Sequence, residues 1–314
     1  MKTLSAERYQ AAVDYLAREG RPLDHALFRY MARRESRDAV IHELAEFQNA
    51  DGGFGHSLEP DAVVAESSVL DTTHALQVLR RIKAEPSVAV VVAAMDYLRQ
   101  TYDASLPGWP IRPFASAETP CAPWWKSADE SAWRTSMEKG RLNPTAEVLG
   151  YFLEYDQPAD AGLIEQVTAA VGRWIDDTDA PLESHELLCL ARLVRSPGLS
   201  ETQREAWAAR IRRDVASVVN ADPGSWDSYG LKPWWIAETP GDPMLGGLEP
   251  GLAVAMLDHE IGRQEAGGGW PPFWDWGGLH PEAWAEARRA WTSVLTEQML
   301  RVLRAHGRLP AGAD

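Results

Sequence analysis

Two neighbouring segments carry carboxylic acids that could exchange protons with a substrate. Glu59 and Asp61 lie two residues apart in a loop, and Asp71 follows within a helical pattern between Leu70 and Leu76. Repulsion between close carboxylates, or burial on an apolar helix, raises a carboxyl pKa and keeps the group protonated near neutral pH. We therefore predict Glu59, Asp61 and Asp71 as candidate general acids or bases.

Each of these acids also has a structural interpretation. Asp61 would cap the N-terminus of a helix, with Pro60 on the approach to that helix. Asp71 would accept a hydrogen bond from a neighbouring loop amide, or favour the helix dipole near a helix start. The sequence leaves both interpretations open beside the catalytic one.

Tryptophan is the second unusual feature. The chain has 14 Trp in 314 residues, and they gather mainly in loops that also carry proline. Indole faces attract cations and stack on sugar rings, whereas the alternative is that they fill gaps between loops and helices. The predicted substrate-binding residues are Trp124, Trp125, Trp234, Trp235, Trp270, Trp274, Asp275 and Trp276, together with His56 in the acidic loop and His74 beside Asp71.

The residues before the acidic loop predict a tight turn between two helices. Residues 48–55 read Gln-Asn-Ala-Asp-Gly-Gly-Phe-Gly. Paired glycines permit positive φ at a helix end, and Gln48 and Asp51 can hydrogen-bond the freed carbonyls and amides. Phe54 would then pack back against the helices.

This octet resembles the QW motif of the terpenoid cyclase and protein prenyltransferase superfamily, in which Gln is followed after two variable residues by Asp-Gly-Gly, an aromatic residue and often Gly. Residues 67–79 are similar to the Thr-rich start of the inner helix that follows such a motif. The resemblance implies an all-α fold, an α/α toroid of paired inner and outer helices. It also implies that Asp71 corresponds to the protonating Asp of the family's Asp-x-Asp-Asp motif, with Thr72 at the last position and Val69 at the first.

An imperfect second copy of the motif lies near the other end of the chain. Residues 268–270, Gly-Gly-Trp, match residues 52–54, and we interpret this copy as lacking the Gln and the Asp. Segments starting near Asn143 and Leu248 are interpreted as further inner-helix starts with an early proline. A repeat that spans both ends favours a single domain over residues 1–314.

Apolar residues at intervals of three and four predict helices along most of the chain, joined by long loops rich in Trp and Pro. Strand patterns are scarce. The expected helices are 6–18, 23–32, 37–47, 67–82, 88–101, 145–155, 163–176, 184–194, 201–219, 252–263 and 281–306. We expect the C-terminal tail, about 309–314, to be disordered.

Composition argues against several classes of protein. A net charge of −15, with 46 acidic and 31 basic residues, disfavours binding to nucleic acid or anionic lipid. No segment has the roughly 18 apolar residues that span a bilayer, and no signal peptide is evident, so we expect a cytoplasmic protein. Cys121 and Cys189 have no metal-binding spacing. We expect no metal and no cofactor, unlike the zinc-dependent protein prenyltransferases.

The leading functional hypothesis is an enzyme resembling the squalene-hopene cyclases, but with one barrel. It would protonate an isoprenoid or other apolar small molecule in a Trp-lined cavity, without metal. The first alternative is a carbohydrate-active α/α-barrel hydrolase or lyase with paired carboxylates. The second is a non-catalytic ligand-binding module. The sequence leaves open the substrate, the acting acid, the oligomeric state and whether the ring of helices closes.

Overall fold

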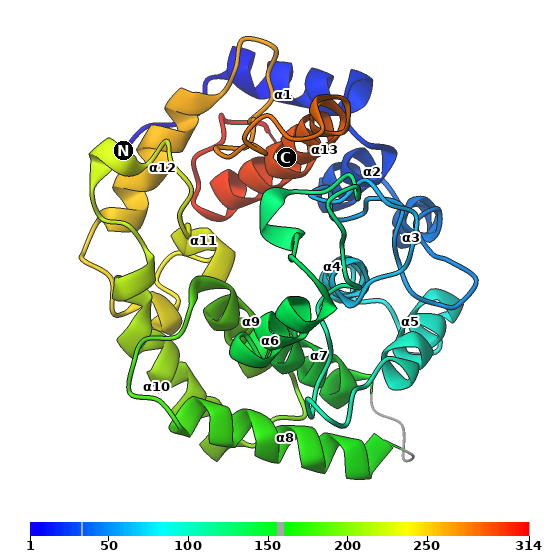
Figure 1. The fold of residues 1–314 in the computed structure, drawn as a ribbon. Helices are drawn as coiled ribbons and strands as arrows, with labels where there is room; N and C mark the ends of the chain where they lie inside the picture. Colours follow the sequence, from blue (N-terminus) through cyan, green and yellow to red (C-terminus); the bar gives the residue numbers. More distant parts are fainter. Residues whose placement is uncertain (33, 156–159, 314) are drawn as a thin grey trace.

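The computed structural model describes residues 1–32, 34–155 and 160–313. Over these ranges the protein has thirteen α-helices, a few short 3₁₀ turns and no β-strand (Figure 1). The expected all-α class is confirmed.

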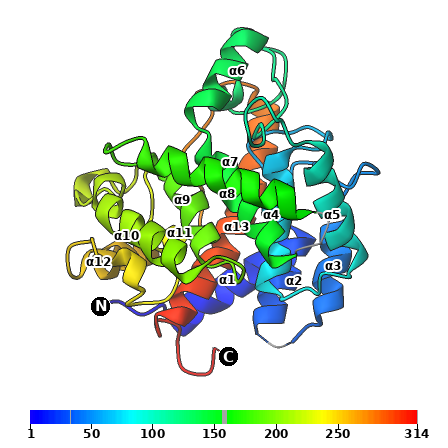
Figure 2. The ribbon, with the colours of Figure 1, turned by 90° about the horizontal axis from the view of Figure 1, so that it is seen from below.

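Alternate helices lie toward the outside of the molecule and nearer its middle (Figure 1). The outside helices are α1 (Ala6–Arg18), α3 (Arg37–Ala45), α5 (Ala89–Gln100), α8 (Ala161–Asp176), α10 (Glu201–Val218) and α12 (Leu252–Arg263). The segment near Leu248, which we interpreted as an inner-helix start, thus leads into an outside helix. The middle helices are α2 (Pro22–Met31), α4 (Val69–Arg81), α7 (Leu142–Glu154), α9 (Ser184–Val194), α11 (Pro233–Ile236) and α13 (Pro281–Ala305). The remaining helix, α6 (Glu130–Lys139), projects from one end of the molecule (Figure 2).

Helices that follow one another in the chain also pack together. Helix α2 contacts α3, α4 contacts α5, α7 contacts α8 and α9 contacts α10; among the middle helices, α4 contacts α7, α7 contacts α9 and α9 contacts α11. The last helix, α13, returns to contact both α1 and α2, and the Leu4 N–H donates to the Arg308 carbonyl at 2.9 Å. The last helix of the chain therefore packs beside the first two (Figure 1).

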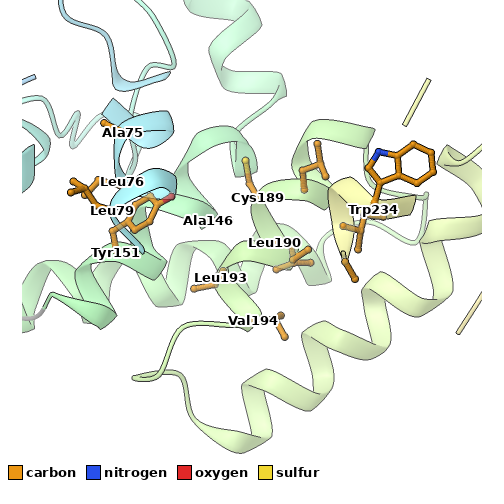
Figure 3. Packing of buried hydrophobic residues seen from close by; sticks show 14 of the residues in the cluster. Ala75, Leu76, Leu79, Ala146, Tyr151, Cys189, Leu190, Leu193, Val194 and Trp234 are labelled. Carbon is orange, nitrogen blue, oxygen red and sulfur yellow. The ribbon is translucent and has the colours of Figure 1, made fainter. Parts of the chain in front are cut away.

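The middle helices build the core. One hydrophobic cluster extends from Leu4 to Leu303. Figure 3 shows Leu76 and Leu79 of α4 beside Tyr151 of α7. Fully burying such a side chain stabilises the fold by roughly 1.5–3 kcal/mol. This packing holds the ends of the middle helices, where the candidate site lies, in fixed positions.

The turn at residues 48–55 forms as its residue types predict. Gln48 Nε2 donates to the carbonyls of Gly52 at 2.9 Å and Val90 at 3.1 Å. Gly52 has a φ of +87°, and a Cβ at this position would lie 2.4 Å from the Ala93 carbonyl oxygen. Only glycine fits there, because an L side chain meets both the unfavourable φ and the neighbouring backbone.

The second copy of the turn contains the glutamine that the sequence analysis described as missing. Gln264 Nε2 donates to the carbonyls of Gly268 at 2.8 Å and Arg8 at 2.9 Å, which is the same arrangement as in the first copy. Gly268 has a φ of +95°, like its counterpart. Our interpretation was wrong about the Gln, and right that the Asp is absent, because Gly267 takes its place.

An aromatic residue after a glycine fixes each of three turns to a middle helix. Its backbone N–H donates to a threonine hydroxyl in the pairs Phe54–Thr72 at 3.1 Å, Trp109–Thr145 at 3.4 Å and Trp270–Thr296 at 3.0 Å. A Cβ on the preceding glycine would lie 2.7 Å or less from a neighbouring side chain in all three copies. The turn is therefore repeated before α4, α7 and α13, with insertions of different length.

Two helices were not expected from the sequence. Helix α6 has no buried residue, so no apolar period marks it, and α11 is one short turn of Pro-Trp-Trp-Ile. Of the tail expected to be disordered, residue 314 lies outside the described residues. Ala313 is buried, and its carbonyl accepts hydrogen bonds from Tyr9 Oη and from Arg304.

Candidate functional site

Three insertions, one of which contains helix α6, meet at one end of the middle helices. Each follows one of the repeated turns, with residues 55–67 leading into α4, 110–141 into α7 and 271–280 into α13. Because each turn fixes its aromatic residue against a middle helix, the loop that follows is anchored at both ends. The loops bring together the acidic pair, a buried arginine and two of the predicted tryptophans, namely Glu59, Asp61, Arg112, Trp274 and Trp276.

Glu59, Asp71 and Arg112 form a buried cluster at the start of α4. Arg112 Nη1 lies 3.1 Å from Glu59 Oε2, and its Nη2 lies 3.6 Å from Asp71 Oδ2. The Glu59 backbone N–H donates to Asp71 Oδ1 at 2.9 Å, and the Ser68 hydroxyl donates to Asp71 Oδ2. The hydrogen bond from a loop amide that we considered for Asp71 is thus observed. Asp71 joins the acidic loop to the helix start.

The three acids of the site share one positive charge. Burial raises the pKa of Glu59 well above its usual value, and repulsion from Asp61 raises it further, while Arg112 opposes the rise. Burial also raises the pKa values of Asp61 and Asp71. Full ionisation would leave two uncompensated negative charges in the interior. Glu59 is therefore the acid that holds its proton most readily.

Asp61 accepts hydrogen bonds from three indoles on one oxygen. The Nε1 atoms of Trp291, Trp276 and Trp274 lie 2.9, 3.0 and 3.4 Å from Asp61 Oδ1. These bonds lower the pKa of Asp61, but less than burial raises it. The interpretation of Asp61 as a helix N-cap is wrong, because Ser68 caps α4. Asp61 instead ties the acidic loop to α13 and to the loop before it.

Aromatic side chains continue from Asp61 toward the surface. Trp274 packs edge-on against Trp291 and Phe273, with ring centroids 5.1 and 5.0 Å apart. The Tyr229 ring follows at 5.9 Å from Trp274, and Tyr229 is 53% exposed. A continuous row of rings therefore leads from the buried acids to the solvent. We call this row, which consists of Trp291, Trp274, Phe273 and Tyr229, the aromatic wall.

Tyr229 also ends a chain of polar groups that the sequence analysis missed. Its hydroxyl lies 2.8 Å from His185 Nε2, and His185 Nδ1 lies 2.9 Å from Glu183 Oε1. Burial acts to raise the pKa of Glu183, but hydrogen bonds from His185 and Ser184 outweigh it and lower the pKa to about 2. Burial and nearby carboxylates raise the pKa of Tyr229 to about 12. A carboxylate, an imidazole and a phenol in line can pass a proton.

His74 lies on α4 three residues after Asp71, and a second buried acid, Glu147, is among the charges that act on it. Glu147 accepts hydrogen bonds from Tyr151 at 2.5 Å, Arg192 at 2.6 Å and Gln77 at 2.9 Å. Burial lowers the pKa of His74 to about 4, and the positive charge of Arg192 adds to the effect. His74 is thus neutral at pH 7, and the charges that act on it come both from the Glu147–Arg192 pair and from Arg112 of the Glu59 cluster.

Three of the predicted tryptophans lie in the interior: Trp234, Trp270 and Trp276 are 3%, 1% and 0% exposed. Of these, only Trp276 bonds one of the candidate acids. Trp270 Nε1 donates to the Glu260 carbonyl at 2.8 Å and fixes the second turn against α12. Trp235 is half-buried, and its Nε1 donates to Gln298 Oε1 at 3.0 Å. Most of this group fills space between helices, which was the structural alternative.

The other predicted binding residues lie nearer the surface. Trp124 is 47% exposed, and the Trp125 ring lies 5.6 Å from the Arg112 guanidinium. Asp275 is exposed and accepts a hydrogen bond from the backbone two residues on, at 2.6 Å. His56 is exposed and hydrogen-bonds the amide side chain of the preceding turn at 2.9 Å. Trp125 thus joins the site, whereas Asp275 and His56 stabilise local turns.

Arg112, Trp291 and the Glu183–His185–Tyr229 chain are the site residues that sequence reasoning missed. Arg112 stands alone in an irregular loop, and Trp291 lies in a long helix among charged residues. One signal in the sequence could have identified Arg112. It lies three residues after Trp109, the aromatic residue of a turn like the one that precedes the acidic loop.

No protein-family model matches the sequence, and a search of curated proteins finds no match. No helix within the described ranges is long and apolar enough to cross a membrane. Among the same residues, no group of three or more His, Cys, Asp and Glu side chains is placed to hold a metal ion.

Proposed function

We propose that the chain forms an α/α toroid of six helical hairpins. The successive contacts of α4, α7, α9 and α11 and the packing of α13 onto α1 and α2 support a closed ring. The turn repeated before α4, α7 and α13 supports a common origin for these hairpins. The side-chain amides of Gln48 and Gln264 each donate to the carbonyl of the glycine four residues on, which supports the resemblance to terpenoid cyclases and protein prenyltransferases.

We propose further that the protein is an acid-catalysed enzyme acting on an apolar, isoprenoid-like molecule, with Glu59 as the proton donor. The proton would pass from Glu59 to an alkene carbon, where the π electrons form the new C–H bond and leave a cation. Arg112 would then stabilise the Glu59 carboxylate. Trp274 would offer a ring face to the cation, worth about 0.5–2 kcal/mol, whereas the Phe273 ring already carries Lys232 and Arg263 at 4.5 and 5.3 Å. Asp71 positions the loop that carries the acid.

The observation that carries this proposal is the sharing of one guanidinium by three buried carboxyls beside an aromatic wall. A carboxyl group whose pKa is raised by an apolar setting keeps its proton near neutral pH and so has a proton to donate when a substrate binds. The three indole bonds occupy Asp61 Oδ1, and Asp71 is held by Ser68 and the Glu59 amide. Glu59 is therefore the most suitable donor of the three.

The test compares Glu59→Gln with Glu66→Gln, an exposed acid of the same loop. Purified variants are incubated with farnesol, geranylgeraniol and squalene, and products are identified by gas chromatography and mass spectrometry. We expect conversion by the wild type and by Glu66→Gln, and a loss of about 10²-fold or more in Glu59→Gln, the usual contribution of a general acid. Undiminished conversion by Glu59→Gln would remove this residue from the mechanism.

A carbohydrate-active enzyme is the second candidate, favoured by the exposed rings of Trp124 and Tyr229. In it, Glu59 and Asp61 would act as a carboxylate pair across a glycosidic bond. The indole bonds on Asp61 weigh against this role. Hydrolysis of an oligosaccharide panel with no conversion of isoprenoids would favour this candidate. Binding without turnover in either panel would favour a non-catalytic module.

A further inference from the structure

A cavity of about 240 Å³ lies at the opposite end of the middle helices from the acid cluster. Asp71 is in the first turn of α4, whereas Arg81, which lines the cavity, is its last residue. Phe28 and Met31 come from the end of α2, and Leu300 comes from the last turns of α13. None of the three candidate acids lines this cavity, so it is separate from the site described above.

The described residues that line the cavity include more arginines than carboxylates. Arg81 Nη1 lies 3.5 Å from Glu297 Oε2, while Arg301 lies 3.1 Å from Glu297 Oε1 and also pairs with Glu238. Arg304 instead donates to two backbone carbonyls, which are neutral. Among the described residues that line the cavity, three guanidinium groups thus face two carboxylates, and the surplus of one positive charge favours an anionic ligand.

We propose that this cavity binds a small amphipathic carboxylate, with its hydrocarbon chain against Phe28, Met31 and Leu300 and its carboxylate at Arg81. The Arg81 side chain is 26% exposed, and its ion pair with Glu297 engages one of its nitrogens. Two parallel N–H groups of a guanidinium suit a carboxylate. A cavity of about 150 Å³ is known to take up benzene, so this larger one has room for a chain of several carbons.

Glu297 makes this binding depend on pH. Burial raises the pKa of Glu297 to about 7, against the opposing charge of Arg81. The groups that face it are Arg81 from α4, Arg301 from its own helix and Asp24 from α2, with Glu238 reached through Arg301. When Glu297 takes up a proton, it no longer forms ion pairs with Arg81 and Arg301, and these arginines can pair with the ligand carboxylate instead. Affinity for the carboxylate therefore rises as the pH falls through about 7.

Octanoate is the probe, and binding to the full chain is measured by isothermal titration calorimetry. We expect octanoate to bind and octylamine, its cationic counterpart, not to bind. Arg81→Gln should weaken octanoate binding about tenfold, as expected for the loss of one charge-assisted pair. Leu300→Trp fills the cavity and should abolish binding. Glu59→Gln should leave it unchanged, because the acid cluster lies at the other end of the helices.

The proposal is overturned by three results: no octanoate binding to the wild type, equal binding to the Arg81→Gln variant, or equal affinity for octylamine. Thermal unfolding of each variant shows whether it is folded. Should Leu300→Trp not fold, Ala305→Trp provides the same test, because Ala305 lines the cavity from an exposed position. Unchanged binding in a folded Ala305→Trp variant would place octanoate elsewhere.

Discussion

Replacing Asp61 by alanine tests whether this carboxylate holds the aromatic wall in place. The change leaves three indole N–H groups without their acceptor: Trp276, which is fully buried, and Trp291 and Trp274, which are half-buried. An unsatisfied buried donor costs about 1–3 kcal/mol. We assign about 2 kcal/mol to Trp276, about 1 to Trp291 and less to Trp274, whose bond is longest at 3.4 Å. Asp61→Ala should therefore lower the free energy of unfolding by about 3 kcal/mol.

Urea unfolding followed by tryptophan fluorescence measures this loss. Asp61→Asn keeps an acceptor oxygen in place and should lose only about 1 kcal/mol, the usual value of one hydrogen bond. Asp275→Ala, an exposed acid of the neighbouring loop, should change stability by less than about 0.5 kcal/mol. If Asp61→Ala is as stable as Asp275→Ala, the indoles are held by packing alone, and the reasoning about Asp61 is refuted.

Two further predictions concern the repeated turn and the second cavity. Gln48→Ala removes two hydrogen bonds to backbone carbonyls and should cost about 2 kcal/mol in urea unfolding. Gln264→Ala removes two such bonds and also the bond that Gln264 Oε1 accepts from Arg8 Nε at 2.9 Å, so it should cost about 3 kcal/mol, and the double variant about the sum. A loss in only one of the two would contradict the role of these glutamines in both turns. The pKa of Glu297 is raised from 4.5 to about 7, so its contribution to stability is present below 4.5 and lost as the pH rises to about 7. At about 1.4 kcal/mol per pKa unit, the free energy of unfolding lost over this pH range is about 3 kcal/mol. Glu297→Gln should remove that pH dependence, and an identical pH profile in wild type and variant would disprove it.

The glycine turns were predictable because their causes are local. Positive φ at Gly52 and the bonds of Gln48 depend on residues within the turn and on the next helix. The second glutamine, Gln264, was equally visible and was overlooked because Gly267 interrupts the motif. The third turn, at Trp109, shares with the other two only a glycine followed by an aromatic residue. Its equivalence to them could be recognised only from the hydrogen bond between the Trp109 N–H and Thr145.

The acid cluster was predicted only in part. The sequence identified Glu59, Asp61 and Asp71 as a group, because they lie close together in the chain. It gave no sign of Arg112, which lies 53 residues from Glu59, or of the indoles, which lie 213 to 230 residues from Asp61. These partners come from the insertions of other hairpins, and no local pattern relates them.

The sequence by itself determined the helical class, the turns that end the helices and the presence of acids beside one of them, because periodicity, glycine conformation and side-chain chemistry act over a few residues. Only the tertiary structure decided which acid is least able to ionise, which tryptophans are core and which reach the site. Those properties depend on burial and on charges brought from distant parts of the chain. The pKa of Glu59 and the three bonds on Asp61 follow from that assembly.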